Sequence, residues 1–398
     1  MILAVADDIS GAAEIAAAGR TFGLTAQVQI KSVASLSAEL VVIDTDTRYR
    51  EIDPRRDIGN ALANYDTIPV EWYYKKVDSV LRGNISTELR AMMQILKVNK
   101  TILAPANPTK GRIISNGQYF IDGRPLNETD FANDPDYPAT SSRVIDLLNA
   151  PSDCTVHSRT PETCTGHEHG IVVADVKSMN DLIKWTEYLD EYTLAAGGSD
   201  FFRAILNKKL TSNGVSGKIN VSEISGKKLF VCGSTSETSR KAVTKAASSG
   251  IPVCSMPDAL FKNTPADDTL INQWADVVLK ALSTSDRVII AISQKTVQDS
   301  QLAENLRNKT ADLVKKILDT VKVRELFIEG GATAEAVLRI LGCFRFDVLA
   351  EYAPGVVQMR MAGRRLGEAR LCLGGAGKKE QYLTIKPGSY PWPEEIWN

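Results

Sequence analysis

Short apolar segments alternate with longer segments of helical periodicity along the whole chain. In the first half, the strand candidates are residues 2–6, 40–44, 71–76, 101–104 and 170–175. In the second half, they are residues 229–232, 251–255, 288–292 and 325–328. Strands that alternate with helices predict a mostly parallel sheet. We therefore predict an α/β fold made of two α/β domains with mostly parallel sheets and a cleft between them.

The chain length favours two domains, because 398 residues exceed what one ordinary hydrophobic core holds together. A segment rich in Ser, Gly, Asn and Lys at residues 211–227 indicates the linker, and we expect domains at 1–215 and 226–398. A net charge of -1 without a basic stripe predicts no nucleic-acid partner. No apolar run approaches the length of a membrane span, and the first residues lack the basic start of a signal peptide. We expect a cytoplasmic location and no membrane partner.

A polar turn at residues 76–84 most directly suggests a ligand site. It follows an aromatic-rich strand and precedes a segment with apolar residues at helical spacing. It contains Lys76, Asp78, Ser79, Arg82 and Asn84. Ligands of open α/β sheets bind beyond the carboxyl ends of strands, and cations beside hydroxyl-binding groups suit a small anionic, hydroxylated ligand. The alternative is a solvated loop that caps the helix.

Two other predicted strands also end in charged residues. Asp7 and Asp8 follow strand 2–6, and Arg48 follows strand 40–44. Because side chains alternate along a strand, we expect Asp7 and Asp8 to point to different sides, one of them toward a ligand. The alternative is that both cap the following helix. In a parallel sheet, Asp8, Arg48 and the 76–84 turn should meet at one edge.

The segment after strand 101–104 predicts irregular structure. Residues 105–112 are a loop punctuated by Pro and Gly, and residues 117–126 are typical of a hairpin with Asp-Gly at its turn. Residues 127–135 are polar, and we interpret them as a lid or rim.

All three histidines lie in one segment with two of the six cysteines. The residues are Cys154, His157, Cys164, His167 and His169. This spacing could hold zinc, but the segment has a loop-like composition and lacks the usual finger elements. We favour a surface loop and predict no disulfide framework and no protein metal site.

Three turns of the second half combine glycine with a hydroxyl residue. Residues 233–236 and 330–333 each lead from a predicted strand into a helix, and Gly388-Ser389 is a third such pair. Free amides and the positive end of a helix dipole suit a phosphate, although each turn alone could be an ordinary tight turn and cap. No Walker or dinucleotide fingerprint is present, which disfavours an oxidoreductase that uses a dinucleotide.

Several of these segments together resemble the four-carbon acid-sugar kinase family. The similar segments are Ala-Asp-Asp-Ile-Ser-Gly-Ala at 6–12, Thr-Asp-Thr-Arg at 45–48, Lys-x-Asp-Ser-x-Leu-Arg-Gly-Asn at 76–84, Pro105 to Arg112, and Gly-Gly-x-Thr at 330–333. The resemblance runs in order along nearly the whole chain. It implies an amino-terminal domain for the sugar acid, a carboxy-terminal domain for ATP, and phosphorylation of the terminal hydroxyl of threonate, erythronate or 3-oxo-tetronate.

The resemblance also implies contact residues. The matching sugar-acid contacts are Asp8, Arg48, Lys76, Val77, Asp78 and Ser79, to which the chemistry of the turn adds Arg82 and Asn84. The matching nucleotide contacts are Ser234, Ser236, Gly330, Gly331, Ala332, Thr333, Pro387, Gly388 and Ser389. The chain departs from the family pattern at Val80, where Thr is usual, and at Ala332, where Glu is common.

Phosphoryl transfer requires positioning, charge neutralisation and a proton acceptor. We expect Arg48, with Lys76 or Arg82, to hold the substrate carboxylate. We expect Asp8 and Asp78 to bind hydroxyls, one of them as general base, and we favour Asp8. Mg²⁺ would arrive with ATP and need few protein ligands. The alternative function is a non-enzymatic sugar-acid binding protein or sensor. For the oligomeric state, a homodimer is a possible assembly.

Overall fold

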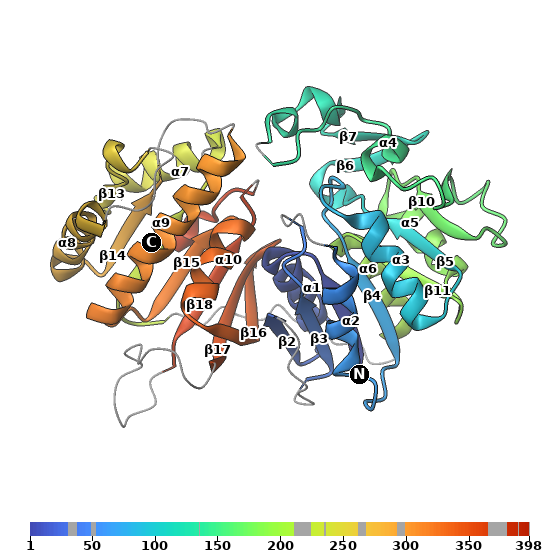
Figure 1. Cartoon of the computed structure of the whole chain (residues 1–398), viewed down its shortest axis with the longest axis horizontal. Coiled ribbons are helices and arrows are strands. Elements are labelled where there is room, and N and C mark those ends of the chain that lie inside the picture. Colours follow the sequence, from blue (N-terminus) through green and yellow to red (C-terminus); the bar gives the residue numbers. More distant parts are fainter. Residues whose placement is uncertain are drawn as a thin grey trace. The chain divides into compact units, whose positions relative to one another are not determined.

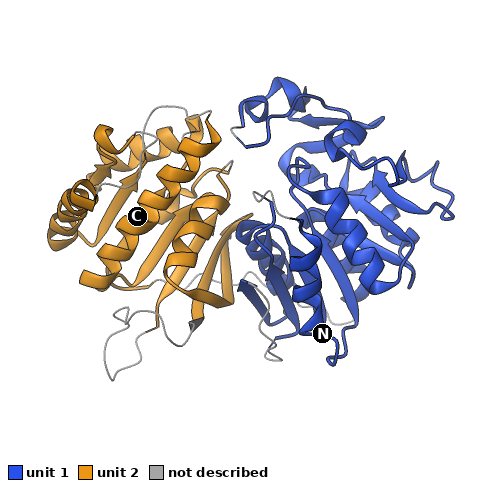
Figure 2. Ribbon diagram, viewed as in Figure 1, with its two compact units in different colours: residues 1–218 blue, residues 219–398 orange. Residues whose placement is uncertain are grey.

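The computed structural model describes residues 1–30, 38–48, 53–134, 136–210, 224–234, 236–261, 268–292, 299–364, 380–388 and 390–397. The chain folds into two compact units, residues 1–218 and 219–398 (Figure 2). Each unit is built on a sheet that is mostly or wholly parallel, with helices between its strands (Figure 1). The predicted α/β class with mostly parallel sheets is confirmed. The segment predicted as a linker, 211–227, lies largely outside the described residues.

Unit 1 contains a parallel sheet in the order β2-β3-β1-β4-β11-β5-β10-β9. Its strands are β1 Ile2–Ala6, β2 Ala26–Ile30, β3 Leu40–Asp44, β4 Trp72–Lys76, β5 Lys100–Ala104, β9 Val156–Arg159, β10 Gly170–Ala174 and β11 Thr193–Gly197. Its α-helices are α1 Ile9–Thr21, α2 Arg55–Ala63, α3 Ile85–Leu96, α4 Val144–Leu148, α5 Met179–Trp185 and α6 Ser199–Leu210. Its short 3₁₀ helices are η1 Pro108–Lys110, η2 Leu126–Glu128, η3 Asp130–Asn133 and η4 Thr186–Tyr188.

The connections of unit 1 reverse direction between β1 and β4. From β1 the chain continues to β2 and β3 on one side of the sheet, then returns past β1 to β4 and continues to the other side. Such a switch point splays the loops at the carboxyl ends of the two neighbouring strands and is the usual ligand position in open α/β sheets. The fold therefore places the Asp7-Asp8 turn and the 76–84 turn where a ligand site is expected.

A small antiparallel sheet of unit 1 extends the predicted hairpin by one strand. Its strands are β6 Arg112–Ser115, β7 Gln118–Ile121 and β8 Arg124–Pro125. Both central residues of each turn, Asn116-Gly117 and Asp122-Gly123, have positive φ, as type I′ hairpin turns require. The Asp122-Gly123 turn was predicted. Strand β6 was missed, although Asn-Gly is itself a strong hairpin signal.

Unit 2 has the sheet order β13-β14-β12-β15-β18-β17-β16. The first five strands in this order pair in parallel, and β17 pairs antiparallel with both β18 and β16. Its strands are β12 Lys228–Cys232, β13 Val253–Ser255, β14 Arg287–Ala291, β15 Glu325–Glu329, β16 Cys343–Ala353, β17 Val356–Arg364 and β18 Tyr382–Lys386. Its helices are α7 Glu237–Ser248, η5 Asp258–Leu260, α8 Asp268–Thr284, α9 Ser300–Thr320, α10 Gly331–Ile340 and η6 Glu394–Trp397.

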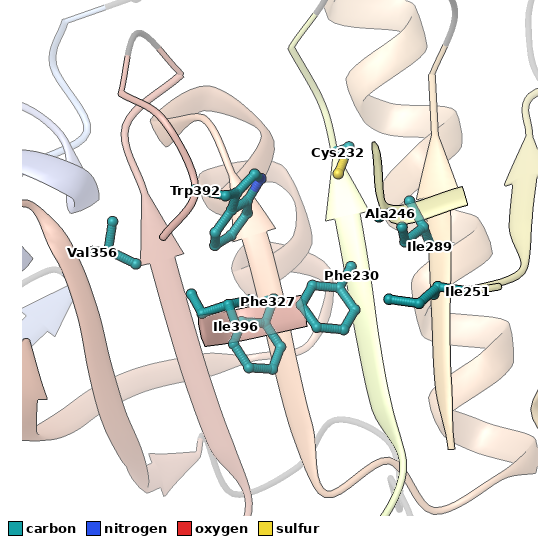
Figure 3. Packing of buried hydrophobic residues seen from close by; sticks show 9 residues of the cluster. All are labelled: Phe230, Cys232, Ala246, Ile251, Ile289, Phe327, Val356, Trp392 and Ile396. Carbon is teal, nitrogen blue, oxygen red and sulfur yellow. The ribbon is translucent and has the colours of Figure 1, made fainter. Parts of the chain in front are cut away.

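An aromatic cluster in the core of unit 2 holds the end of the chain against the sheet. Phe230 of β12 stacks on Phe327 of β15 with ring centroids 4.3 Å apart, and Trp392 approaches both rings edge-on (Figure 3). Ile396 of η6 is buried in the same cluster. Burial of each large apolar side chain contributes roughly 1.5–3 kcal/mol. The cluster thereby anchors the segment that follows β18, to which three of the predicted nucleotide contacts belong, Pro387, Gly388 and Ser389.

The sequence prediction missed β2, β9 and β11. Two of the three are hard to detect locally: β11 is rich in small residues, and β9 is a half-buried edge strand with polar residues. The segment 154–169 is therefore not wholly a loop, because it contains β9 with His157. No helix among the described residues is both long enough and apolar enough to cross a bilayer.

Candidate functional site

Arg48 lies between two adjacent carboxylates in unit 1. Its Nε and Nη2 atoms donate to Asp7 at 2.7 and 2.9 Å, and Nη1 and Nη2 donate to Asp8 at 2.9 and 2.8 Å. Asp8 also caps α1 by accepting from the Gly11 amide at 2.8 Å. The expectation that the two aspartates point to different sides is wrong. Strand β1 ends at Ala6, so strand alternation no longer applies, and both carboxylates face one guanidinium.

The electrostatics of this group are those of a buried ion network, with Arg48 only 4% exposed. Burial alone would raise the pKa of Asp7, but the Arg48 guanidinium outweighs it and the pKa is lowered. Burial would lower the pKa of Arg48, but the surrounding carboxylates of Asp7, Asp8 and Asp78 raise it well above its ordinary value. Asp7 and Arg48 therefore favour their charged forms in this buried setting.

Lys76, the last residue of β4, lies close to Asp8. The Lys76 ammonium donates to the Val77 carbonyl at 2.7 Å and lies 3.7 Å from the Glu14 carboxylate. Both groups lie next to Gly11 of α1, where a Cβ would be 2.8 Å from Asp8 Oδ1 and 3.1 Å from Lys76 Nζ. Only glycine fits without displacing one of them. Val77 itself is fully buried.

Asp78 is held by two arginines. Arg82 binds it in a bidentate manner at 2.8 Å through Nε and Nη2, and Arg48 Nη1 lies 3.6 Å away. Burial would raise the pKa of Asp78, but Arg82 and Arg48 lower it strongly. Asn84 donates to the Thr47 carbonyl at 3.2 Å and so ties this turn to the loop after β3.

The segment predicted as a rim contributes to the same region. Arg82 Nη1 binds Asp134 at 2.8 Å, and the Phe131 ring lies 5.3 Å from the Arg82 Cζ atom and 5.6 Å from the Arg112 Cζ atom. Arg112 Nη1 in turn donates to the Ser79 hydroxyl. A planar guanidinium stacked on an aromatic face and bound to a hydroxyl is well placed for carboxylate recognition.

Sequence reasoning missed three charged residues here: Glu14, Lys110 and Arg112. Glu14 is buried in α1, pairs with Lys110 and accepts from Ser199 at 3.0 Å. Burial would raise its pKa, but Lys110 and Lys76 lower it to about 2. The 105–112 loop follows a strand, so the strand-end argument could have identified Lys110 and Arg112. A lone Glu in an Ala-rich helix was the only signal for Glu14.

These residues form one group, which we call the strand-end cluster. Its members come from the ends of β1, β3, β4 and β5 and from α1: Asp7, Asp8, Glu14, Arg48, Lys76, Asp78, Ser79, Arg82, Lys110 and Arg112. The structure thus brings Asp8, Arg48 and the 76–84 turn together at one sheet edge. Carboxylates and cations alternate there, which suits a ligand with both an anionic group and hydroxyls.

In unit 2 the three turns singled out in the sequence lie side by side. They follow β12, β15 and β18, which are neighbours in the sheet. A Cβ on Gly233 would lie 2.2 Å from Thr333 Oγ1, and a Cβ on Gly388 would lie 3.8 Å from Ser234 Oγ and 3.9 Å from the Gly330 Cα atom. We call residues 233–236, 330–333 and 387–388 the glycine turns, Thr235 lying outside the described residues. Ser389 also lies outside the described residues.

Two helices begin at the glycine turns. Ser236 caps α7 by accepting from the Ser239 amide at 3.2 Å, and Gly330, with φ 92°, caps α10. A glycine cap has no side chain to cover the first-turn amides of α10, where Gly331, Ala332 and Thr333 lie. Backbone amides at a helix start bind phosphate readily.

A buried ion pair lies directly before two of the glycine turns. Glu329 and Lys386 end the neighbouring strands β15 and β18, are fully buried, and lie 2.6 Å apart. Ser239 donates to Glu329 at 2.5 Å, and Lys386 donates to the Pro387 carbonyl at 3.0 Å. The pair therefore links two of the three turns to the start of α7.

The zinc alternative for residues 154–169 finds no support in their placement. Cys164 is buried and lies 3.5 Å from Glu168, whereas His157 is on β9. Within the described ranges, which include this whole segment, no group of three or more His, Cys, Asp or Glu side chains is placed to hold a metal ion.

Comparison with known proteins identifies both units. A sugar-binding N-terminal domain model matches residues 2–205, and a nucleotide-binding C-terminal domain model matches residues 229–389. A D-threonate kinase of Salmonella typhimurium is 26% identical over 89% of each chain. A 3-oxo-tetronate kinase of Actinobacillus succinogenes is 24% identical over 98% of this chain and 96% of its own.

Solved structures support the fold. A crystal structure from Salmonella typhimurium matches with a TM-score of 0.75 at 19% identity, covering 100% of this chain and 97% of its own. One from Haemophilus influenzae matches with a TM-score of 0.65 at 20% identity, covering 97% and 96%. Together with the sugar-binding and nucleotide-binding domain matches, the kinase relatives show that the chain belongs to the four-carbon acid-sugar kinase family.

Proposed function

We propose that this chain is an ATP-dependent kinase that phosphorylates the terminal hydroxyl of a four-carbon sugar acid, namely threonate, erythronate or 3-oxo-tetronate. Unit 1 binds the acid and unit 2 binds ATP. The observation that carries the proposal is the strand-end cluster, which gathers buried carboxylates and cations at the topological switch point of a sugar-binding unit. The names of the relatives support the substrate class.

The substrate carboxylate is assigned to Lys76, Ser79 and Arg112. Arg48 was the first expectation for this role, but its three guanidinium nitrogens donate to Asp7 and Asp8. We assign Arg48 the role of positioning these two carboxylates.

Asp8 is assigned as the group that binds the reacting hydroxyl and accepts its proton. Asp78, the other candidate, has a strongly lowered pKa and a bidentate bond to Arg82, so it is a poor proton acceptor. Because the hydroxyl proton leaves late in phosphoryl transfer, a carboxylate suffices as acceptor. Arg82 and Asn84 then hold the shape of the 76–84 turn.

ATP is assigned to the glycine turns of unit 2. The amides of Gly331, Ala332 and Thr333, the hydroxyls of Ser234 and Ser236, and the backbone at Pro387 and Gly388 would surround the phosphates. Mg²⁺ would be held mainly by the phosphates and would neutralise their charge.

The test is a coupled assay of ADP release from the full chain with threonate, erythronate and 3-oxo-tetronate. We expect turnover with at least one acid and none with erythritol, which has the hydroxyls but no carboxylate. Asp8→Asn should lower kcat by at least a hundredfold, since general-base catalysis contributes roughly 10²–10⁴-fold. Asn is also a good helix N-cap, so α1 should persist.

The matched control is Asp53→Asn, because Asp53 is half exposed and pairs only with the neighbouring Arg55 among its described contacts. It should leave kcat unchanged. Binding of an acid without ADP release would favour the sensor alternative, and full activity of Asp8→Asn would end the assignment of the base.

A further inference from the structure

Unit 1 contains a polar cavity at the carboxyl ends of β9 and β10. Its volume is about 280 Å³, just under the usual range for small-molecule sites, which suits a small ligand. The residues that matter for its chemistry are Gly117, Arg143, Ser158, Arg159, Thr160 and Asp175. None of them belongs to the strand-end cluster.

Asp175 lines one wall of the cavity and is held in place by hydrogen bonds. The Gly117 amide donates to its two carboxylate oxygens at 3.1 and 3.3 Å, and Ser158 Oγ donates to it at 3.3 Å. Asp175 is 4% exposed, and its carbonyl accepts from the buried Trp185 indole at 2.9 Å. The Asn116-Gly117 turn is thereby pinned to the end of β10. A Cβ on Gly117 would lie 3.1 Å from Ser158 Oγ, so the close fit depends on glycine.

Two arginines supply the positive charge of the cavity. Arg143 Nη1 lies 3.6 Å from Asp146, and Arg159 Nε lies 3.6 Å from Glu168, both longer than a charge-assisted hydrogen bond. Arg159 Nη1 also donates to the Ser158 carbonyl at 3.1 Å. A guanidinium carries five N–H donors, so these contacts leave both arginines able to bind a carboxylate.

The cavity is separate from the strand-end cluster. Strand β6 begins at Arg112, which contacts Ser79 of the cluster, and ends at Ser115, next to the Asn116-Gly117 turn that lines the cavity. At about 3.3 Å per residue, the four-residue separation from Arg112 to Asn116 corresponds to roughly 13 Å. A four-carbon molecule cannot reach both places.

We propose that this cavity is a second binding site, for a small hydroxylated carboxylate. The arginine pair binds the carboxylate, and Asp175, Ser158 and Thr160 bind the hydroxyls. The proposal goes beyond the kinase function and does not depend on it, since no residue of the cavity has a role in phosphoryl transfer.

The experiment is calorimetric titration of the full chain with L-tartrate, a hydroxylated four-carbon dicarboxylate. The wild type and Asp8→Asn, which alters only the strand-end cluster, should both show a saturable tartrate site. Arg143→Ala and Arg159→Ala should each weaken that site at least tenfold. Arg55→Ala, which removes an exposed arginine elsewhere in unit 1, should leave it unchanged.

Two results would overturn the proposal. One is the absence of saturable binding to the wild type. The other is binding whose affinity is unchanged in Arg143→Ala, whatever its level in Asp8→Asn, which would place tartrate outside this cavity. Circular dichroism checks that each variant folds. If Arg159→Ala does not fold, the test rests on Arg143→Ala alone, because the Arg143 side chain is 63% exposed and its removal should not disturb folding.

Discussion

Replacing Arg48 by methionine tests whether the buried ion network determines the stability of unit 1. Methionine keeps the length of the side chain and removes its charge. The variant leaves the carboxylates of Asp7 and Asp8 buried, exposed only 1% and 6%, without the four hydrogen bonds that now compensate them. Removing one partner of a buried ion pair typically costs about 3–5 kcal/mol. We expect the free energy of unfolding of unit 1 to fall by that amount at pH 7.

The effect should depend on pH in a defined direction. In the wild type the pKa of Asp7 is lowered, so its contribution to stability is present above the pKa of the unfolded chain and is lost as the pH falls through the folded-state pKa. In Arg48→Met, burial without the guanidinium should raise that pKa, and the carboxyl should take up a proton at higher pH. The stability difference between the two proteins should therefore begin to shrink above about pH 4, as the pH falls through the raised pKa of the variant, and should shrink further below about pH 4, where the wild type loses the contribution of Asp7.

Hydrogen exchange measured by mass spectrometry can report each unit separately. A peptide that covers β1, Ile2–Ala6, reports unit 1, and a peptide that covers β12, Lys228–Cys232, serves as the internal reference in unit 2. Protection of β1 should decrease in the variant while protection of β12 stays the same. The control is Arg55→Met, because the Arg55 side chain is 68% exposed and its pair with Asp53 should contribute nothing measurable.

Either of two results would refute the reasoning. If Arg48→Met behaves like the exposed control at pH 7, the network does not stabilise the unit. If the loss of stability grows as the pH falls, the carboxylates are not the groups left uncompensated.

Two further substitutions test other parts of the molecule. Glu14 has a pKa of about 2, against an ordinary value of 4.5, so its ionised form should contribute up to about 3 kcal/mol to the stability of the folded chain above pH 4.5. This contribution should be lost as the pH falls toward 2, and Glu14→Gln should lack that pH-dependent loss in an acid-unfolding experiment. Identical acid-unfolding curves for the wild type and Glu14→Gln would contradict the prediction. Gly233→Ala places a Cβ 2.2 Å from Thr333 Oγ1, so titration with a fluorescent ATP analogue should show at least tenfold weaker binding. Gly59→Ala, where a Cβ meets nothing within 4 Å, should bind the analogue normally, and equal affinity in both variants would refute the role of the glycine turns.

Local pattern predicted most of the strands and helices. Strands such as β1 and β4 are short apolar or aromatic runs that end in polar turns, and helices such as α3 carry apolar residues on one face. The elements that were missed lack such contrast. β11 reads Thr-Leu-Ala-Ala-Gly and becomes a strand because it inserts between β4 and β5, where both of its edges find hydrogen-bond partners.

The candidate site was predicted in outline from the same pattern. Polar residues at the ends of parallel strands meet at one sheet edge, so the sequence alone predicts that Asp8, Arg48 and Lys76 lie together. Glu14 escaped prediction because nothing in its own helix indicates that Lys110, 96 residues away, is its partner. The role first expected for Arg48 also changed once its contacts with the two aspartates were seen.

The amino-acid sequence by itself determined which residues end the strands, which turns contain glycine and a hydroxyl, and hence the family. The tertiary structure decided which charges neutralise one another. Arg48 reaches Asp7 across 41 residues because β3 lies beside β1, and Gly388 lies against Ser234 because β12, β15 and β18 are neighbours. Strand order depends on packing across the whole sheet, and no local segment encodes it.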